Sequence, residues 1–159
     1  TFRQADTIMR NFFRKKAESG DSAAQAAQTT TQEKSAGGAG TILVVDDSPT
    51  EQHVLKSILE KAGFDVETAA DGQEGIDQAK RLKPKLILMD VVMPVLNGFQ
   101  ATRKLSEDSE TSDIPVIMVT TKDQETDKKW GLRQGAEDYL VKPVTAEDLL
   151  LRVRAALGG

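Results

Sequence analysis

The sequence has no cysteine, one histidine and few aromatic residues. The absence of cysteine excludes disulfide bridges, thiol nucleophiles and cysteine-ligated zinc or iron–sulfur sites. Because His53 is the only histidine, a metal site built from several imidazoles is excluded too. The longest apolar runs, such as Ile42 to Val45, are far shorter than the roughly 18 residues that a membrane-spanning helix needs. We therefore expect a soluble, cytoplasmic protein whose site chemistry uses oxygen and amine groups.

Charge is distributed unevenly along the 159 residues. Residues 1–40 contain six Lys or Arg against four Asp or Glu, a balance of +2, whereas residues 41–159 contain fifteen against twenty-one, a balance of −6. An acidic body argues against a nucleic-acid-binding surface, because phosphate contacts require clustered Lys and Arg. We therefore expect no nucleic acid partner, and we treat residues 41–159 as one domain.

The basic extension divides into two parts. Over residues 2–18 apolar side chains recur at helical spacing with arginines opposite them, so residues 1–18 are predicted to be an amphipathic helical extension. Residues 19–40 are rich in Ala, Gln, Thr, Ser and Gly, which is typical of a flexible linker. Two interpretations of the helix stay open: it packs on the body or is the remnant of a longer chain, or it docks on a partner groove or an anionic membrane surface.

From Thr41 onward, short apolar runs alternate with segments of helical spacing. Near-continuous apolar strands are expected when a parallel sheet is covered on both faces. Ser48 to Glu51 reads as a capping box with proline at the first helical position, and Asp71 and Asn97 also precede helix starts. The pattern predicts a (βα)5 doubly wound parallel sheet. The predicted strands are residues 42–45, 65–69, 86–89, 115–119 and 138–141.

Polar residues follow four of these strands. In an open parallel α/β sheet, the functional site lies at the carboxyl ends of the strands. One polar residue leaving a buried strand needs no functional explanation, but four together indicate a site. The residues concerned are Asp46-Asp47, Asp90, Thr120-Thr121 and Lys142-Pro143.

Three carboxylates at one sheet edge repel each other unless a proton or a cation neutralises them. Oxygen ligands without His or Cys select a hard ion, and an open site that also admits phosphate favours Mg²⁺. A carboxylate is also a nucleophile toward phosphoryl groups. Asp90, which stands alone, is the nucleophile candidate, while Asp46 and Asp47 form a pair suited to the ion. Lys142 supplies an ammonium and Thr120 a hydroxyl for the phosphoryl oxygens.

These motifs, taken in order, resemble the CheY-like receiver domain of bacterial response regulators in two-component and chemosensory systems. The resemblance covers residues 41–157 and implies a flavodoxin-like sheet of strand order 2-1-3-4-5; CheY is a standard example of that order. It rests on Ile42 to Ser48, Leu88 to Pro94 with Asn97-Gly98, Val119 to Thr121, and Tyr139 to Pro143.

The resemblance assigns chemical roles by matched position. It implies that Asp90 accepts a phosphoryl group from a histidine kinase of the CheA kind. Asp47 and the backbone carbonyl of Val92 would ligate Mg²⁺ together with Asp90, and Asp46 would act mainly through water on the ion. On this view the protein is no enzyme beyond catalysing its own phosphorylation and dephosphorylation.

The resemblance also implies a switch. The hydroxyl of Thr120 would move to the phosphoryl group and the ring of Tyr139 would turn inward. This would remodel a partner-binding face formed by the fourth helix, fifth strand and fifth helix of the repeat. Thr121 departs from the smaller residue that many relatives carry, so phosphoryl access or lifetime is expected to differ.

A finer resemblance is to single-domain regulators of type IV pilus twitching motility, carried by Asp46 to Glu51, Asn97 to Arg103 and Val119 to Ala136. With the sequence ending soon after the last predicted helix, we expect a stand-alone regulator. Its output would be contact with a pilus or signalling protein, or it would drain phosphate from a kinase shared with another regulator. The alternative function is a Mg²⁺-dependent phosphatase or phosphotransferase with an aspartyl nucleophile. Recruitment to the cell pole or a membrane surface stays a further expectation.

Overall fold

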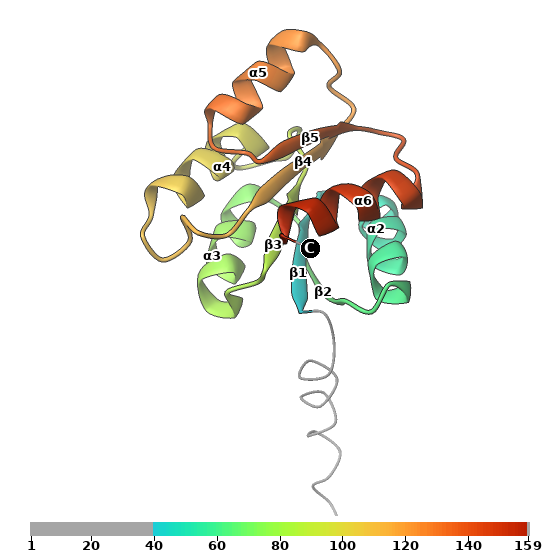
Figure 1. Cartoon of the computed structure of the whole chain (residues 1–159). Coiled ribbons are helices and arrows are strands. Elements are labelled where there is room, and N and C mark those ends of the chain that lie inside the picture. The colour runs from blue at the N-terminus through green and yellow to red at the C-terminus, as the bar shows by residue number, and fades with distance from the viewer. Residues whose placement is uncertain (1–39, 159) are drawn as a thin grey trace, which may run out of the picture. The chain divides into compact units, whose positions relative to one another are not determined.

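The computed structural model describes residues 40–158, which form a five-stranded parallel sheet with five helices (Figure 1). The fold class predicted from the sequence is therefore confirmed. The strands are β1 (Thr41–Val45), β2 (Asp65–Ala69), β3 (Leu86–Met89), β4 (Val116–Thr120) and β5 (Asp138–Val141). The helices are α2 (Pro49–Lys61), α3 (Gly72–Leu82), α4 (Gly98–Glu107), α5 (Glu125–Arg133) and α6 (Ala146–Ala156).

The strands lie side by side in the order β2-β1-β3-β4-β5, as the family resemblance implies. All four pairings are parallel. The order reverses at β1, so the chain winds first to one side of the sheet and then to the other. β1 and β3 meet at this switch point, and their carboxyl ends are where a site is expected in this class of fold.

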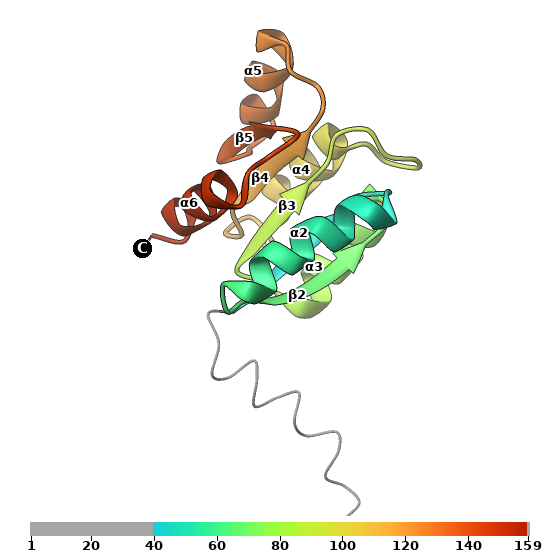
Figure 2. The ribbon, with the colours of Figure 1, turned by 90° about the vertical axis from the view of Figure 1, so that its right-hand side faces the viewer.

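Helices cover both faces of the sheet (Figures 1 and 2). Side chains of α3 and α4 pack on one face with Leu43, Ile87 and Met118 of the strands. Side chains of α2 and α6 pack on the other face with Val44 and Leu88. This two-sided burial is the physical reason that the central strands read as continuous apolar runs in the sequence.

The fourth strand lies one residue later than predicted, at Val116–Thr120 instead of 115–119. Pro115 has no N–H to donate to a ladder. Its carbonyl still accepts from the amide of Ile87, at 2.9 Å. As a result, Thr120 is the last residue of the strand itself and not the first residue after it.

The start of α2 differs from the predicted capping box. Ser48 caps the helix, and its Oγ accepts from the amide of Glu51 at 3.3 Å. The amide of Ser48, however, donates to Asp46 Oδ1 at 2.9 Å, which takes the place of the reciprocal bond to the Glu51 side chain. The complete capping box lies instead at the start of α4, between Asn97 and Gln100. The Glu51 carboxylate is thus available for another partner.

The predicted amphipathic helix, residues 1–18, and almost all of the predicted linker, residues 19–40, lie outside the described residues. Within residues 40–158, none of the helices has the length and apolar character needed to cross a bilayer.

Candidate functional site

The candidate residues emerge at one edge of the sheet because their strands run in the same direction. Each strand end is held by one more ladder-like hydrogen bond. The amide of Asp46 donates to Ala69 O at 3.0 Å, that of Asp90 to Val45 O at 2.9 Å, and that of Lys142 to Thr120 O at 2.8 Å. These backbone hydrogen bonds therefore position the main chain of Asp46, Asp90 and Lys142 independently of their side-chain contacts.

Asp46, Asp47 and Asp90 each offer a carboxylate oxygen, and these oxygens lie within 4.8 Å of one another. Asp46 and Asp90 are buried, whereas Asp47 is exposed. A cluster of oxygen ligands that is open on one side suits a hard divalent cation such as Mg²⁺. The donor set therefore fits the ion that the sequence predicts.

Lys142 faces the two buried carboxylates of this cluster, with its side chain only 11% exposed. Its Nζ is 2.7 Å from Asp46 Oδ2 and 3.8 Å from Asp90 Oδ2. Burial alone would lower the pKa of Lys142, but the hydrogen bond to Asp46 and the charges of Asp90 and Asp46 raise it above its ordinary value. The side chain therefore stays an ammonium ion at neutral pH.

Both oxygens of Asp46 already accept a hydrogen bond, Oδ1 from the amide of Ser48 at 2.9 Å and Oδ2 from Lys142 at 2.7 Å. Asp47 is the exposed carboxylate of the cluster, so it is the one most open to an ion from solvent. An indirect role for Asp46, through water, and a direct one for the other two stay predictions from the family resemblance.

Burial raises the pKa of the Asp90 carboxyl, because the ionised form loses hydration, and the charge of Asp46 acts in the same direction. Three contacts oppose the shift: the charge of Lys142, a hydrogen bond from Thr120, and the Val91 amide, which donates to Oδ1 at 2.7 Å. The carboxylate is thus dehydrated on most of its surface while donors hold it in place, as a nucleophile requires.

The loop after Asp90 carries Val92, the predicted source of a carbonyl ligand, with its side chain exposed. Gly98, at the start of α4, packs against the backbone of Asp90. A Cβ atom at residue 98 would lie 2.0 Å from the Asp90 carbonyl oxygen, so only glycine fits there. The amide of Gly98 donates to Val91 O at 2.9 Å and closes the loop beside the site.

The backbone of Lys122 connects Thr120 and Tyr139, the predicted switch pair, through hydrogen bonds. The amide of Lys122 lies 3.4 Å from Thr120 Oγ1, and Tyr139 Oη donates to Lys122 O at 2.9 Å. Burial, with the nearby charges of Asp127 and Asp90, raises the pKa of Tyr139 to about 12. The Tyr139 ring is 8% exposed, so it lies inside the domain in this structure.

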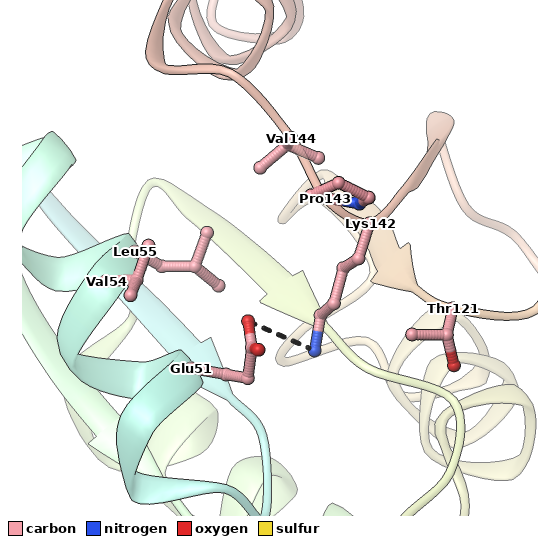
Figure 3. Close-up of a pocket in the computed structure, with 7 residues that line it drawn as sticks. All are labelled: Glu51, Val54, Leu55, Thr121, Lys142, Pro143 and Val144. Atoms are coloured by element: carbon pink, nitrogen blue, oxygen red, sulfur yellow. Dashed lines mark ion pairs between the residues drawn. The ribbon is translucent and has the colours of Figure 1, made fainter.

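Sequence reasoning missed two residues of the site, both on α2. Glu51 Oε1 is 3.7 Å from Lys142 Nζ, and Figure 3 shows the two side chains facing each other. Gln52 Nε2 donates to Asp46 O at 2.6 Å and to Ala69 O at 3.2 Å, which ties α2 to the ends of β1 and β2. Neither contact has a sequence signal, because each joins residues from separate elements.

An apolar groove lies beside the acidic cluster, between α2 and the segment after β5 (Figure 3). Lys142, which contacts Asp46, lines the groove together with Glu51 and Thr121. The remaining lining residues are Val54, Leu55, Pro143 and Val144. The groove therefore combines an apolar surface with an ion pair.

Residues 42–154 match the family of response regulator receiver domains. The chain is 61% identical over 118 residues to protein PilH of Pseudomonas aeruginosa. The match covers 74% of this chain and 98% of that protein. Several other curated relatives, 38–44% identical, are longer proteins of which this chain spans about half, 47–50% of their length.

Solved structures give the same grouping. The chemotaxis protein CheY4 of Vibrio cholerae is 35% identical with a TM-score of 0.69, and the match covers 73% of this chain and 97% of that one. The receiver domain of the sensor histidine kinase PA1611 of Pseudomonas aeruginosa is 32% identical with a TM-score of 0.71, over 76% of this chain and 98% of that one. In that structure a magnesium ion is coordinated in the active-site cleft.

Proposed function

Because the chain belongs to the response regulator receiver family, we propose that it is a signalling regulator whose Asp90 accepts a phosphoryl group from a histidine kinase. One observation carries the proposal. The buried Asp90 carboxylate lies 3.8 Å from the Lys142 ammonium, beside two further carboxylates, at the edge where a parallel sheet presents its site. The arrangement supplies a nucleophile and a cation for the phosphoryl oxygens together.

The proposed step is a direct transfer. A carboxylate oxygen of Asp90 bonds to the phosphorus atom while the phosphorus–nitrogen bond to the kinase histidine breaks. The electron pair of that bond stays on the nitrogen, and the histidine, already protonated on its other ring nitrogen, leaves as neutral imidazole. The Lys142 ammonium, which pairs with Asp46, also stabilises the negative charge of the incoming phosphoryl oxygens. The Thr120 hydroxyl donates a hydrogen bond to them. The result is an acyl phosphate on Asp90.

Mg²⁺ is the proposed cofactor, held by Asp47, Asp90 and the Val92 carbonyl, with Asp46 acting through water. When bound, the ion neutralises the carboxylate cluster and the charge on the phosphoryl group. The chain's own residues then have two tasks: Lys142 and Thr120 orient the phosphoryl oxygens, and the packing of Gly98 on the Asp90 backbone holds the nucleophile in place.

The kinase partner is proposed to be of the CheA kind and to approach over the groove beside Lys142. Glu51 and the apolar side chains at positions 54, 55 and 144 give that groove one charged end and one apolar end. Output is proposed through the face formed by α5, β5 and α6, toward a pilus or signalling protein, or through competition for phosphate with a second regulator. The 61% identity to PilH supports a place in type IV pilus twitching motility, in the cytoplasm.

The alternative, a Mg²⁺-dependent phosphatase or phosphotransferase acting on small molecules, has less support. The family match extends over nearly all of the described residues. Asp90 is also followed by Val91 and Val92, where an enzyme of that kind would be expected to carry a second catalytic acid.

Intact-mass analysis after incubation with a small-molecule phosphodonor and Mg²⁺ tests the proposal. Wild type should gain one phosphoryl group and Asp90→Asn none. Asp77→Asn, which removes an exposed carboxylate on α3, is the matched control and should gain the group as wild type does. Absence of the adduct on wild type, or its persistence on Asp90→Asn, would overturn the assignment of Asp90.

A further inference from the structure

Helix α5 has an unusually small buried face. Gly131 is its one buried residue, whereas each of the other four helices of the described domain buries at least two. Its first residue also has no side-chain cap, because Gln124 makes no capping hydrogen bond. Trp130 and Leu132, on either side of Gly131, are 47% and 48% exposed. Gly131 is therefore the position at which α5 itself packs most closely on the domain.

The residue against Gly131 is Tyr139. A Cβ atom on Gly131 would lie 3.0 Å from Cδ2 and 3.2 Å from Cε2 of the Tyr139 ring, and 3.4 Å from Cγ of Met118. The two ring distances are tighter than almost all real Cβ contacts, so a side chain at residue 131 would require the ring to shift by a few tenths of an ångström. The same ring donates its hydroxyl hydrogen to Lys122 O, at 2.9 Å. The edge of the ring thus lies against Gly131 of α5, and its hydroxyl is bonded to Lys122, in the segment before that helix.

We propose that Gly131 positions the Tyr139 ring, and that the buried ring, seated against this glycine, holds α5 on the domain. The missing side chain leaves the space that the ring occupies. A ring that leaves this space removes the contact beneath the single buried residue of α5, so the helix and its exposed Trp130 are released together. The proposal deepens the switch proposed above and rests on it for the link to phosphorylation.

This role differs from that of a glycine needed for backbone conformation. Gly131 lies inside a helix, where alanine is the better helix former and glycine weakens the element. A substitution to alanine is therefore favourable for α5 alone and unfavourable for the ring. The gain in helix preference and the displacement of the ring therefore act on α5 in opposite directions. Replacing Tyr139 by a residue without a ring removes the second effect and leaves the first.

Two measurements test the proposal, and the composition of the chain makes both specific. Tyr139 is the only tyrosine and there is no cysteine, so nitration by tetranitromethane reads this ring without competing thiols. Gly131→Ala should nitrate at least about tenfold faster than wild type, since an exposed phenol ionises near pH 10 and reacts as the phenolate. A nitration rate within twofold of wild type would overturn the proposal.

Hydrogen exchange measured by mass spectrometry tests the second half. In Gly131→Ala the α5 amides should exchange about tenfold faster than in wild type, while those of α2 stay unchanged. In a Tyr139→Ala background, the same change at 131 should slow α5 exchange instead, because only the helix preference remains. Slower α5 exchange in both backgrounds would show that the ring does not use this space.

These tests need no phosphoryl group, so they separate the two proposals. Wild type that fails to form the Asp90 adduct overturns the proposed phosphoacceptor role of Asp90 and leaves the nitration result standing. Wild type that forms the adduct, with Gly131→Ala unchanged in nitration and in α5 exchange, overturns the role of Gly131 alone. The adduct on wild type with faster nitration and exchange in Gly131→Ala supports both.

Discussion

Replacing Lys142 by methionine should destabilise the domain strongly, although the new side chain has a similar volume. The ammonium lies 2.7 Å from Asp46 Oδ2, and the two side chains are 11% and 2% exposed. It also lies 3.8 Å from Asp90 Oδ2. The substitution leaves two buried carboxylates without the cation that faces them, and this cost is larger than the loss of the ion pair itself.

The magnitude follows from the distances. At an effective dielectric constant of about 20, the attraction of the ammonium is about 6 kcal/mol for Asp46 and about 4 kcal/mol for Asp90. The dehydration of the lysine offsets a large part of this, and breaking a buried pair on one side costs about 3–5 kcal/mol in practice. Total stabilities of single domains are about 5–15 kcal/mol, so Lys142→Met should unfold at much lower denaturant concentration.

Urea unfolding followed by the fluorescence of Trp130, the only tryptophan, measures this cost. Lys80→Met is the matched control, because Lys80 pairs with Asp108 at a similar 3.0 Å with both side chains exposed to water. Its effect should be several times smaller, since water and salt screen exposed pairs. Added Mg²⁺ should restore part of the loss in Lys142→Met, about 2.7 kcal/mol at 100 times the dissociation constant. Equal costs for the two variants would refute the reasoning.

Two further substitutions test the tyrosine and the metal site. Because burial raises the pKa of Tyr139 to about 12 in the folded state, the neutral ring contributes stability that is complete below pH 10 and is lost as pH rises toward 12, at most about 2.7 kcal/mol. Tyr139→Phe should lack this loss, and parallel stability curves for the two proteins across that interval would contradict the assignment. Asp47→Asn removes an exposed carboxylate of the cluster and should weaken Mg²⁺ binding by at least about tenfold in calorimetric titration, whereas Asp77→Asn should not change it.

The strands were predictable because the sheet is covered on both faces. Residues 86–89 were placed without error, since burial on both faces favours an unbroken apolar run. The bounds 138–141 are also correct, although this edge strand begins with Asp138 and only its two central residues are buried. β4 begins one residue later than predicted because Pro115, the first residue of the predicted run, cannot donate to the ladder. The candidate site was predictable for a related reason: parallel strands bring their final residues to one edge.

The contacts of Glu51 were not predictable from its motif. Ser48 to Glu51 has the pattern of a capping box, but Asp46 lies two residues before the cap and its Oδ1 reaches the Ser48 amide first, at 2.9 Å. The glutamate then pairs with Lys142, which is distant in sequence and comes close only when β5 is in the sheet. A local sequence pattern indicates which side chains can form a hydrogen bond. The tertiary structure decides which of the competing acceptors is used.

Two adjacent strands connect the acidic cluster to α5 through very few residues. The end of β4 carries Thr120 and, two residues on, Lys122, whose amide faces the threonine and whose carbonyl accepts from Tyr139. β5 carries Tyr139, and Lys142 follows its last residue. A charge added at Asp90, as proposed above, would attract Lys142 and the Thr120 hydroxyl, and Thr120 is two hydrogen bonds from the Tyr139 ring. On the proposals made above, the coupling of the carboxylates to α5 therefore needs no long pathway, only the ends of two adjacent strands.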